Sequence, residues 1–70
     1  MTIYLNDQPI VISDTPLNLQ ECLLRYASIS QDKKGIAIAV NEEVIPKSEW
    51  KNYILKNNDR LLLIIAAQGG

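Results

Sequence analysis

Residues 61–65 read LLLII, a stretch that is apolar at every position and decides the fold. A strand without polar alternation is normally central in its sheet, screened on both faces or screened on one face by a partner protein. The chain continues as AAQGG at residues 66–70. Two glycines have no Cβ, so the backbone there can thread a slot too narrow for any side chain. We therefore expect the last strand to present a slim tail, in which Gly70 carries the reacting carboxylate and Gly69 provides the narrow approach.

The composition excludes several kinds of chemistry. The chain has 70 residues, which makes one domain near the lower limit for a single hydrophobic core. Cys22 is the one cysteine and there is no histidine, so an internal disulfide, a zinc site and histidine acid/base catalysis are excluded. We expect a reducing compartment, no metal, no cofactor and no catalytic side chain. The chain is not expected to be an enzyme.

Charge and the N-terminal residues narrow the range of partners. Seven basic and eight acidic residues give a net charge of -1, and they form no basic stripe of the kind that binds nucleic acid. Residues 1–7 (MTIYLND) carry neither a basic start nor a long apolar core, so no signal peptide or membrane span is predicted. We expect a soluble, intracellular protein.

Far upstream of the last strand, the N-terminal residues predict a hairpin. Residues 2–5 and 10–12 are β-rich runs separated by NDQP, a cluster of turn formers at residues 6–9. The predicted inward side chains are Ile3, Leu5, Ile10 and Ile12. A sheet that is covered on one side by a helix requires this alternation.

The covering helix is predicted to follow the hairpin. Asn18 can cap its N-terminus, with Glu21 reaching back in a capping box and Leu17 and Cys22 forming a hydrophobic staple. Thr15-Pro16 is an alternative start. The apolar positions at helical spacing are Leu19, Cys22, Leu23 and Tyr26, while Gln20, Glu21 and Arg25 face away.

The middle of the chain alternates short strands and turns. Residues 28–34 are predicted to form a loop and residues 36–40 (IAIAV) a third strand, followed by a polar turn at 41–43. Residues 44–45 predict a short strand that Pro46 ends. Residues 47–51 predict a helical turn or an irregular corner, residues 53–55 a brief strand and residues 56–59 a tight turn.

Together these elements predict an α+β fold of the β-grasp, ubiquitin-like kind. A right-handed crossover through the helix places the later strands beside the first, so the last strand pairs with the first in parallel. The predicted sheet is mixed, with four to five strands and one main helix packed on one face. We expect residues 1–66 to form this domain and residues 67–70 to form a flexible C-terminal tail.

Along nearly its whole length the chain resembles the sulfur carrier proteins of thiamine biosynthesis. The resemblance is carried by NDQ at residues 6–8, Glu21 and Leu23 in the helix, AVN at 39–41, VIPK at 44–47 followed by Trp50, and Gly69-Gly70. The chain departs from the family at Asn58, where a glycine is usual. Asparagine tolerates the left-handed conformation that such a turn needs, so we expect the turn to survive.

This resemblance implies a function for the tail. In the family an ATP-dependent adenylating enzyme activates the terminal glycine, here Gly70, and a persulfide supplied by a desulfurase displaces AMP. The resulting thiocarboxylate, whose sulfur is soft and nucleophilic, donates sulfur to thiazole synthase. The folded body serves as a recognition handle. The resemblance also implies that the protein works in the cytoplasm of a bacterium or the stroma of a plastid.

Other functions of the same tail stay open. Sulfur carriage for molybdopterin synthesis uses the same fold and diglycine, and a ubiquitin-like modifier would transfer its Gly70 acyl group to a substrate lysine. A β-grasp interaction domain with an accidental diglycine is the simplest alternative, because chain ends are often small and polar.

Four side chains outside the tail have competing interpretations. Cys22 could relay sulfur, but an inert packed thiol is favoured on the apolar helix stripe. Trp50 and Tyr53 are expected to fill the edge of the core rather than to contact a partner. Tyr4 lies opposite the inward side chains of its strand. We expect Tyr4 and alternate members of residues 61–65 to form an exposed patch where an activating enzyme docks.

Overall fold

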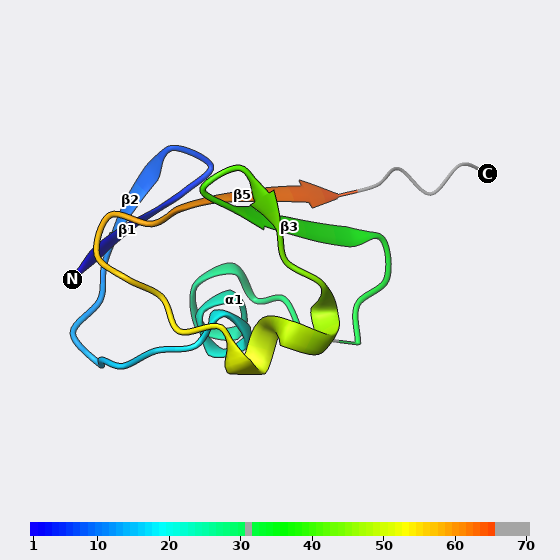
Figure 1. Ribbon diagram of the computed structural model, residues 1–70, viewed down its shortest axis with the longest axis horizontal. Coiled ribbons are helices and arrows are strands. Elements are labelled where there is room, and N and C mark those ends of the chain that lie inside the picture. The colour runs from blue at the N-terminus through cyan, green and yellow to red at the C-terminus, as the bar shows by residue number, and fades with distance from the viewer. Residues whose placement is uncertain (31, 66–70) are drawn as a thin grey trace.

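The computed structural model describes residues 1–30 and 32–65, which form one mixed sheet and two helical segments. The sheet has five strands in the order β2-β1-β5-β3-β4. Their bounds are Thr2–Leu5 (β1), Gln8–Val11 (β2), Ile36–Val40 (β3), Glu43–Val44 (β4) and Arg60–Ile65 (β5). The helix α1 spans Leu19–Ala27, and the 3-10 helix η1 spans Lys47–Asn52. Figure 1 shows the strands in one layer, with α1 and η1 together on one side of it.

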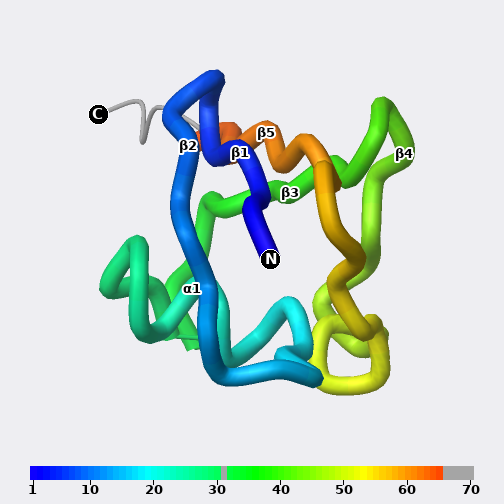
Figure 2. Tube along the Cα trace, turned by 90° about the vertical axis from the view of Figure 1, so that its left-hand side faces the viewer, coloured from blue at the N-terminus to red at the C-terminus, as the bar shows by residue number. Residues whose placement is uncertain are grey.

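The last strand is the centre of the sheet, as predicted. β5 pairs in parallel with β1, where Leu5 lies opposite Leu61, and antiparallel with β3, where Ile38 lies opposite Leu63. Its two neighbouring strands thus come from distant parts of the chain. The turned view in Figure 2 shows the same arrangement, with the sheet above and α1 and residues 47–52 below. The expected mixed sheet with one main helix on one face is confirmed.

The N-terminal hairpin has a tighter turn than the sequence predicts. Leu5 pairs with Gln8, so the turn consists of Asn6 and Asp7 alone, with φ angles of 48° and 68°. Positive φ at both central residues is the signature of a type I′ hairpin turn. The expectation that residues 6–9 form the turn was wrong, because Gln8 and Pro9 already belong to β2. Pro9 is tolerated there since β2 is an edge strand.

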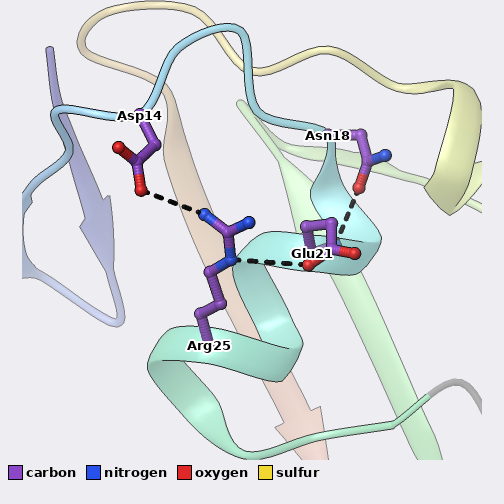
Figure 3. Close-up of polar contacts among 4 residues, drawn as sticks. All are labelled: Asp14, Asn18, Glu21 and Arg25. Carbon is purple, nitrogen blue, oxygen red and sulfur yellow. Dashed lines mark hydrogen bonds and ion pairs between the residues drawn. The ribbon is translucent and has the colours of Figure 1, made fainter.

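The helix begins where the predicted cap places it. The Glu21 N–H donates to Asn18 Oδ1 at 2.7 Å, so Asn18 satisfies one of the free amides of the first turn. The alternative start at Thr15-Pro16 was wrong. The Glu21 carboxylate does not complete the predicted capping box. Figure 3 shows it pointing along the helix to Arg25, whose Nε lies 3.4 Å away, while Arg25 Nη1 lies 3.4 Å from Asp14.

The helix buries most of its predicted stripe. Leu19, Cys22 and Leu23 are buried, but Tyr26 is 39% exposed, which corrects its placement in the core. The reason lies at the end of the helix. Ser28 has a left-handed φ of 55°, and the Ile29 N–H then donates to Leu23 O at 3.0 Å. This turn brings Ile29 into the core in place of a fourth helical position.

The segment after β4 packs beneath the sheet beside α1. Trp50 is 1% exposed and its Nε1–H donates to Ile45 O at 2.9 Å, so its polar atom is satisfied inside the core. The helical turn expected at residues 47–51 is confirmed as η1. Residues 53–55 form no regular strand; a single bridge joins Ile54 to Asn18. Tyr53 is partly buried against the core, as expected.

The turn before β5 forms as predicted, with Asn58 in the left-handed region at a φ of 72°. Asp59 is buried and organises the turn. Its Oδ2 accepts the Lys56 N–H at 2.8 Å, and its Oδ1 accepts Asn41 Nδ2–H at 2.9 Å. A buried carboxylate needs such donors to offset its desolvation. The position of Arg60, where β5 begins, is thereby fixed relative to the β3–β4 turn.

Candidate functional site: the last strand at the root of the tail

The predicted reacting residues lie outside the described residues. Gly69 and Gly70, with the whole predicted tail at 67–70, follow the last described position, Ile65. The described part of the candidate site is therefore β5, which carries the chain to that point, together with the groups that hold β5 in place. The site is built from these residues.

The two faces of β5 differ in exposure although the strand is apolar on both. Leu61 points toward α1 and is 3% exposed. Its neighbour Leu62 is 52% exposed and Ile64 is 47% exposed. In the part of the chain that the structure describes, no element covers this outer face (Figures 1 and 2). The sequence predicted that this strand is screened either on both faces or on one face by a partner. Screening on both faces was wrong.

An outer patch forms around these exposed side chains. Cross-strand partners lie on the same face of a sheet, and the partners of Leu62 and Ile64 on β3 are the small residues Ala39 and Ala37. Both larger side chains therefore stand above their neighbours. On the other edge of β5, Tyr4 of β1 pairs with Arg60 and is partly buried. We call Tyr4, Leu62 and Ile64 the outer patch. The predicted exposure of alternate positions is confirmed for Leu62 and Ile64, whereas Tyr4 is only partly exposed.

Two hairpin turns hold β5 from opposite sides, a feature that the sequence analysis missed. In the β3–β4 turn, Asn41 and Glu42 have φ angles of 51° and 72°, closely matching Asn6 and Asp7 in the β1–β2 turn. The Asn41 N–H donates to Arg60 O at 2.8 Å, and Asn41 Oδ1 accepts the Arg60 N–H at 3.0 Å. The signal in the sequence is an Asn-acidic pair between two β-rich runs, typical of a two-residue turn.

Asn6 makes the equivalent contacts farther along the strand. Its N–H donates to Leu61 O at 2.9 Å, and its Oδ1 accepts the Leu63 N–H at 2.8 Å. The register between β1 and β5 ends at Leu61, so this side chain continues the hydrogen bonding of β5 after the strand β1 has ended. Among the described residues, Asn6 thus makes the last hydrogen bond on this edge of β5 before the tail.

Cys22 has the character of a packed thiol. It is a free cysteine, 1% exposed, in the cluster that α1 forms with the sheet. Burial raises the pKa of its thiol to about 11, so little of it is the nucleophilic thiolate at neutral pH. These properties support the packing interpretation and weigh against a sulfur relay.

The described residues offer neither a metal site nor a membrane-spanning helix. No three His, Cys, Asp or Glu side chains there are grouped so that they could hold a metal ion. None of the described helices has the length and hydropathy needed to span a membrane. The outer patch and the two asparagine turns are therefore the main features along β5, the strand that leads to the tail.

The architecture defines a class, that of β-grasp domains with a central last strand that leads into the C-terminal residues. Comparison with solved structures agrees. A crystal structure of a thiamine biosynthesis protein (ThiS) from Geobacter metallireducens superposes with a TM-score of 0.78 at 22% identity, over all of both chains. An NMR structure of a Geobacter metallireducens thiamine biosynthesis protein gives a TM-score of 0.74 at 22% identity, over all of this chain and 88% of that one. These matches establish the fold.

The sequence places the chain in a family. The model of the ThiS family matches residues 3–70. The sulfur carrier protein ThiS of Escherichia coli K12 is 31% identical over 42 residues, which cover 60% of this chain and 64% of the E. coli protein. The match thus spans somewhat less than two thirds of that relative. Because the family model covers nearly every residue, the chain belongs to the ThiS family, and the resemblance seen in the sequence is confirmed.

Proposed function

We propose that this protein is a sulfur carrier that donates sulfur for thiazole formation in thiamine biosynthesis, with the Gly70 carboxylate as the group that carries the sulfur. The single observation that supports this most is the family match, which extends through both terminal glycines. A second support is the position of β5, a central strand that leads directly into the residues before the diglycine.

The chemistry requires activation before sulfur can be added. A carboxylate is a poor acyl donor, so its oxygen first attacks the α-phosphorus of ATP on an adenylating enzyme; pyrophosphate leaves and an acyl adenylate forms. The terminal sulfur of a protein persulfide then attacks the acyl carbon, and AMP leaves. A thiol cleaves the S–S bond of the resulting acyl disulfide. The products are the Gly70 thiocarboxylate and a disulfide that contains the cleaving thiol.

This division of labour leaves the carrier without a catalytic side chain. Its partners in the proposal are an adenylating enzyme, a desulfurase that supplies the persulfide and a thiazole synthase that accepts the sulfur. The sulfur of a thiocarboxylate is a soft anion suited to attack on a carbon electrophile. Gly69 supports the reaction by keeping the chain next to Gly70 free of a side chain.

The experiment that tests the function is intact mass spectrometry. The protein is incubated with ATP, cysteine, a desulfurase and the adenylating enzyme of the thiamine pathway, beside a variant that lacks Gly70. The expected result is a mass gain equal to replacement of one oxygen by one sulfur, seen only with the intact chain. An unchanged mass with enzymes shown to be active would contradict the proposal. Covalent linkage of Gly70 to lysines would indicate a modifier instead.

The outer patch is where the adenylating enzyme docks in this proposal. The patch is apolar, is uncovered by described residues and lies on the strand that leads to the tail. Apolar surface of this kind commonly marks a contact with a partner. We expect Leu62→Ser and Ile64→Ser each to raise the KM of the carrier about tenfold, because each removes an apolar contact worth roughly 1.4 kcal/mol.

Matched controls separate docking from general surface change. Val11→Ser alters a residue that is 77% exposed on the edge strand β2, and Leu24→Ser alters an exposed residue of α1 on the other side of the sheet. Both should leave the KM within about twofold of the wild type. If Leu24→Ser raised the KM as much as Leu62→Ser, the enzyme would dock on the helical side and the proposed patch would be wrong.

A further inference from the structure

The two asparagine turns act at different points of the same strand. Asn41 bonds to Arg60, where β5 begins, and is tied to the buried Asp59. Asn6 bonds to Leu61 through its N–H and to Leu63 through its side chain. The two turns have nearly the same backbone angles, so the difference between them is their position. Asn41 holds the start of β5, whereas Asn6 holds the half from which the tail leaves.

The half of β5 next to the tail is held unequally on its two edges. On one edge, β3 pairs with it as far as Ile65, which lies opposite Ile36. On the other edge, the backbone of β1 pairs only as far as Leu61. Past that point, Asn6 Oδ1 is the one described group that bonds to this edge, at the Leu63 N–H. Removing this acceptor would leave the course of residues 63–65 set by β3 alone.

We propose that Asn6 is a positioning residue for sulfur loading. Its side chain fixes the direction in which β5 leads into the tail. This inference rests on the proposed function, because it assumes that an enzyme must receive Gly70. The described hydrogen bonds of Asn6 to β5 go to the backbone, at Leu61 O and the Leu63 N–H. It acts through Leu63 and through the strand that follows.

A loss of positioning and a loss of stability are expected to change the kinetics in different ways. A docked carrier whose tail is misdirected reaches the adenylating site less often, so kcat falls while KM, set by the outer patch, stays constant. A variant that is only less stable has fewer folded molecules, so its apparent KM rises while kcat is unchanged. The loss of one hydrogen bond, about 1 kcal/mol, corresponds to roughly a fivefold fall in kcat.

The decisive variants keep the backbone of the turn intact. Asn6→Gly accepts the positive φ but removes the acceptor, and Asn6→Asp keeps an oxygen acceptor at the same place. Asn41→Gly is the control at the other turn. It removes the equivalent acceptor at Arg60 and also the amide donor to the buried Asp59, so its stability is measured as well. Hydrogen exchange at the Leu63 amide reports the contact directly and independently of any enzyme. ATP–pyrophosphate exchange with the adenylating enzyme, over a range of carrier concentrations, gives kcat and KM.

We expect Asn6→Gly to lower kcat about fivefold with little change in KM and to speed exchange of the Leu63 amide by a similar factor. Asn6→Asp should restore both, and Asn41→Gly should leave kcat unchanged. Equal kcat for the wild type and Asn6→Gly, or an effect confined to KM, would overturn the inference while leaving sulfur carriage intact. A wild-type protein that gains no sulfur with active enzymes would overturn the inference together with the proposed function.

Discussion

The two faces of β5 carry similar side chains and meet opposite surroundings. Leu61 is 3% exposed beneath the sheet, and Leu62, the next residue, is 52% exposed above it. Hydrophobicity alone therefore does not say which side of a central strand is covered. The inner face contributes to folding, since it packs with α1 and η1. The outer face is left with apolar surface that folding does not use, and this is the surface that a partner can cover.

The largest expected effect on stability comes from a substitution on the inner face of the sheet, the face that packs against α1. Ile38 is fully buried opposite Leu63, so Ile38→Ala should lower the free energy of unfolding by about 3 kcal/mol through lost burial and a residual cavity. Ile64→Ala makes the same chemical change on the outer face and should cost about 1 kcal/mol or less. Urea denaturation measures both. Equal losses would show that the two faces are equally important for stability.

A protein of this size has little stability to lose, and Ile38→Ala could unfold it. A pair of milder substitutions at the same two positions avoids this problem. Ile38→Val should cost about 1 kcal/mol, because it removes one buried methyl group. Ile64→Val should be close to neutral, since both residues are β-branched and suit a strand. Urea denaturation measures the difference in the free energy of unfolding between the two variants, provided that both unfold with the same dependence on urea concentration. The sign of that difference sharpens the comparison between the two faces.

The core between α1 and the sheet should also make stability depend on alkaline pH, through Cys22 of α1. In the unfolded chain the Cys22 thiol ionises near its ordinary pKa of 9.0, whereas burial raises its pKa to about 11 in the folded protein. Below pH 9.0 both states keep the proton. As the pH rises from 9.0 to about 11 the unfolded chain releases it first, so the free energy of unfolding should fall by about 2 kcal/mol.

Cys22→Ala is the control for this prediction. Burial, Asp59 and Glu43 raise the pKa of Tyr53 as well, and that contribution, of the same sign, remains in the variant. The difference in slope between the wild type and Cys22→Ala, measured by urea denaturation at several pH values, isolates the thiol. Identical slopes would mean that Cys22 is more accessible to water than its 1% exposure indicates.

A smaller effect is expected at the cap that starts the covering helix. Asn18→Ala removes the acceptor of the Glu21 N–H and should lower the free energy of unfolding by about 1 kcal/mol. Asn18→Asp keeps an acceptor and should retain most of the stability. If both variants lost the same amount, the contribution of Asn18 would come from its backbone bridge to Ile54 rather than from capping.

Much of the fold could be predicted because local and long-range signals agree. The apolar run at 61–65, the cap at Asn18 and the turn at Asn58 each follow from side-chain chemistry that acts over a few residues. The failures occur where tertiary packing chooses between local options. Tyr26 has helical spacing but is exposed, because Ser28 reverses the chain and Ile29 fills the core instead.

The candidate site was predicted only in part. Strand alternation placed Tyr4 opposite the inward side chains of its strand and predicted that alternate members of residues 61–65 are exposed, but it did not say which of them. The asparagine turns could not be predicted, because the side chain of Asn6 meets Leu63 only after the hairpin has folded beside a strand 57 residues away in sequence. No local pattern records such a contact. The resemblance pointed to Gly69 and Gly70, and their role stays a prediction.

The sequence by itself determined the elements, their order and the family, since hydrophobic periodicity, caps and turn residues act locally and the diglycine is written in the chain. Only the tertiary structure decided which face of β5 is covered and how firmly each half of that strand is held. The physical reason is that burial and hydrogen-bond partners are properties of neighbours in space, and the neighbours of β5 come from the N-terminus and the middle of the sequence.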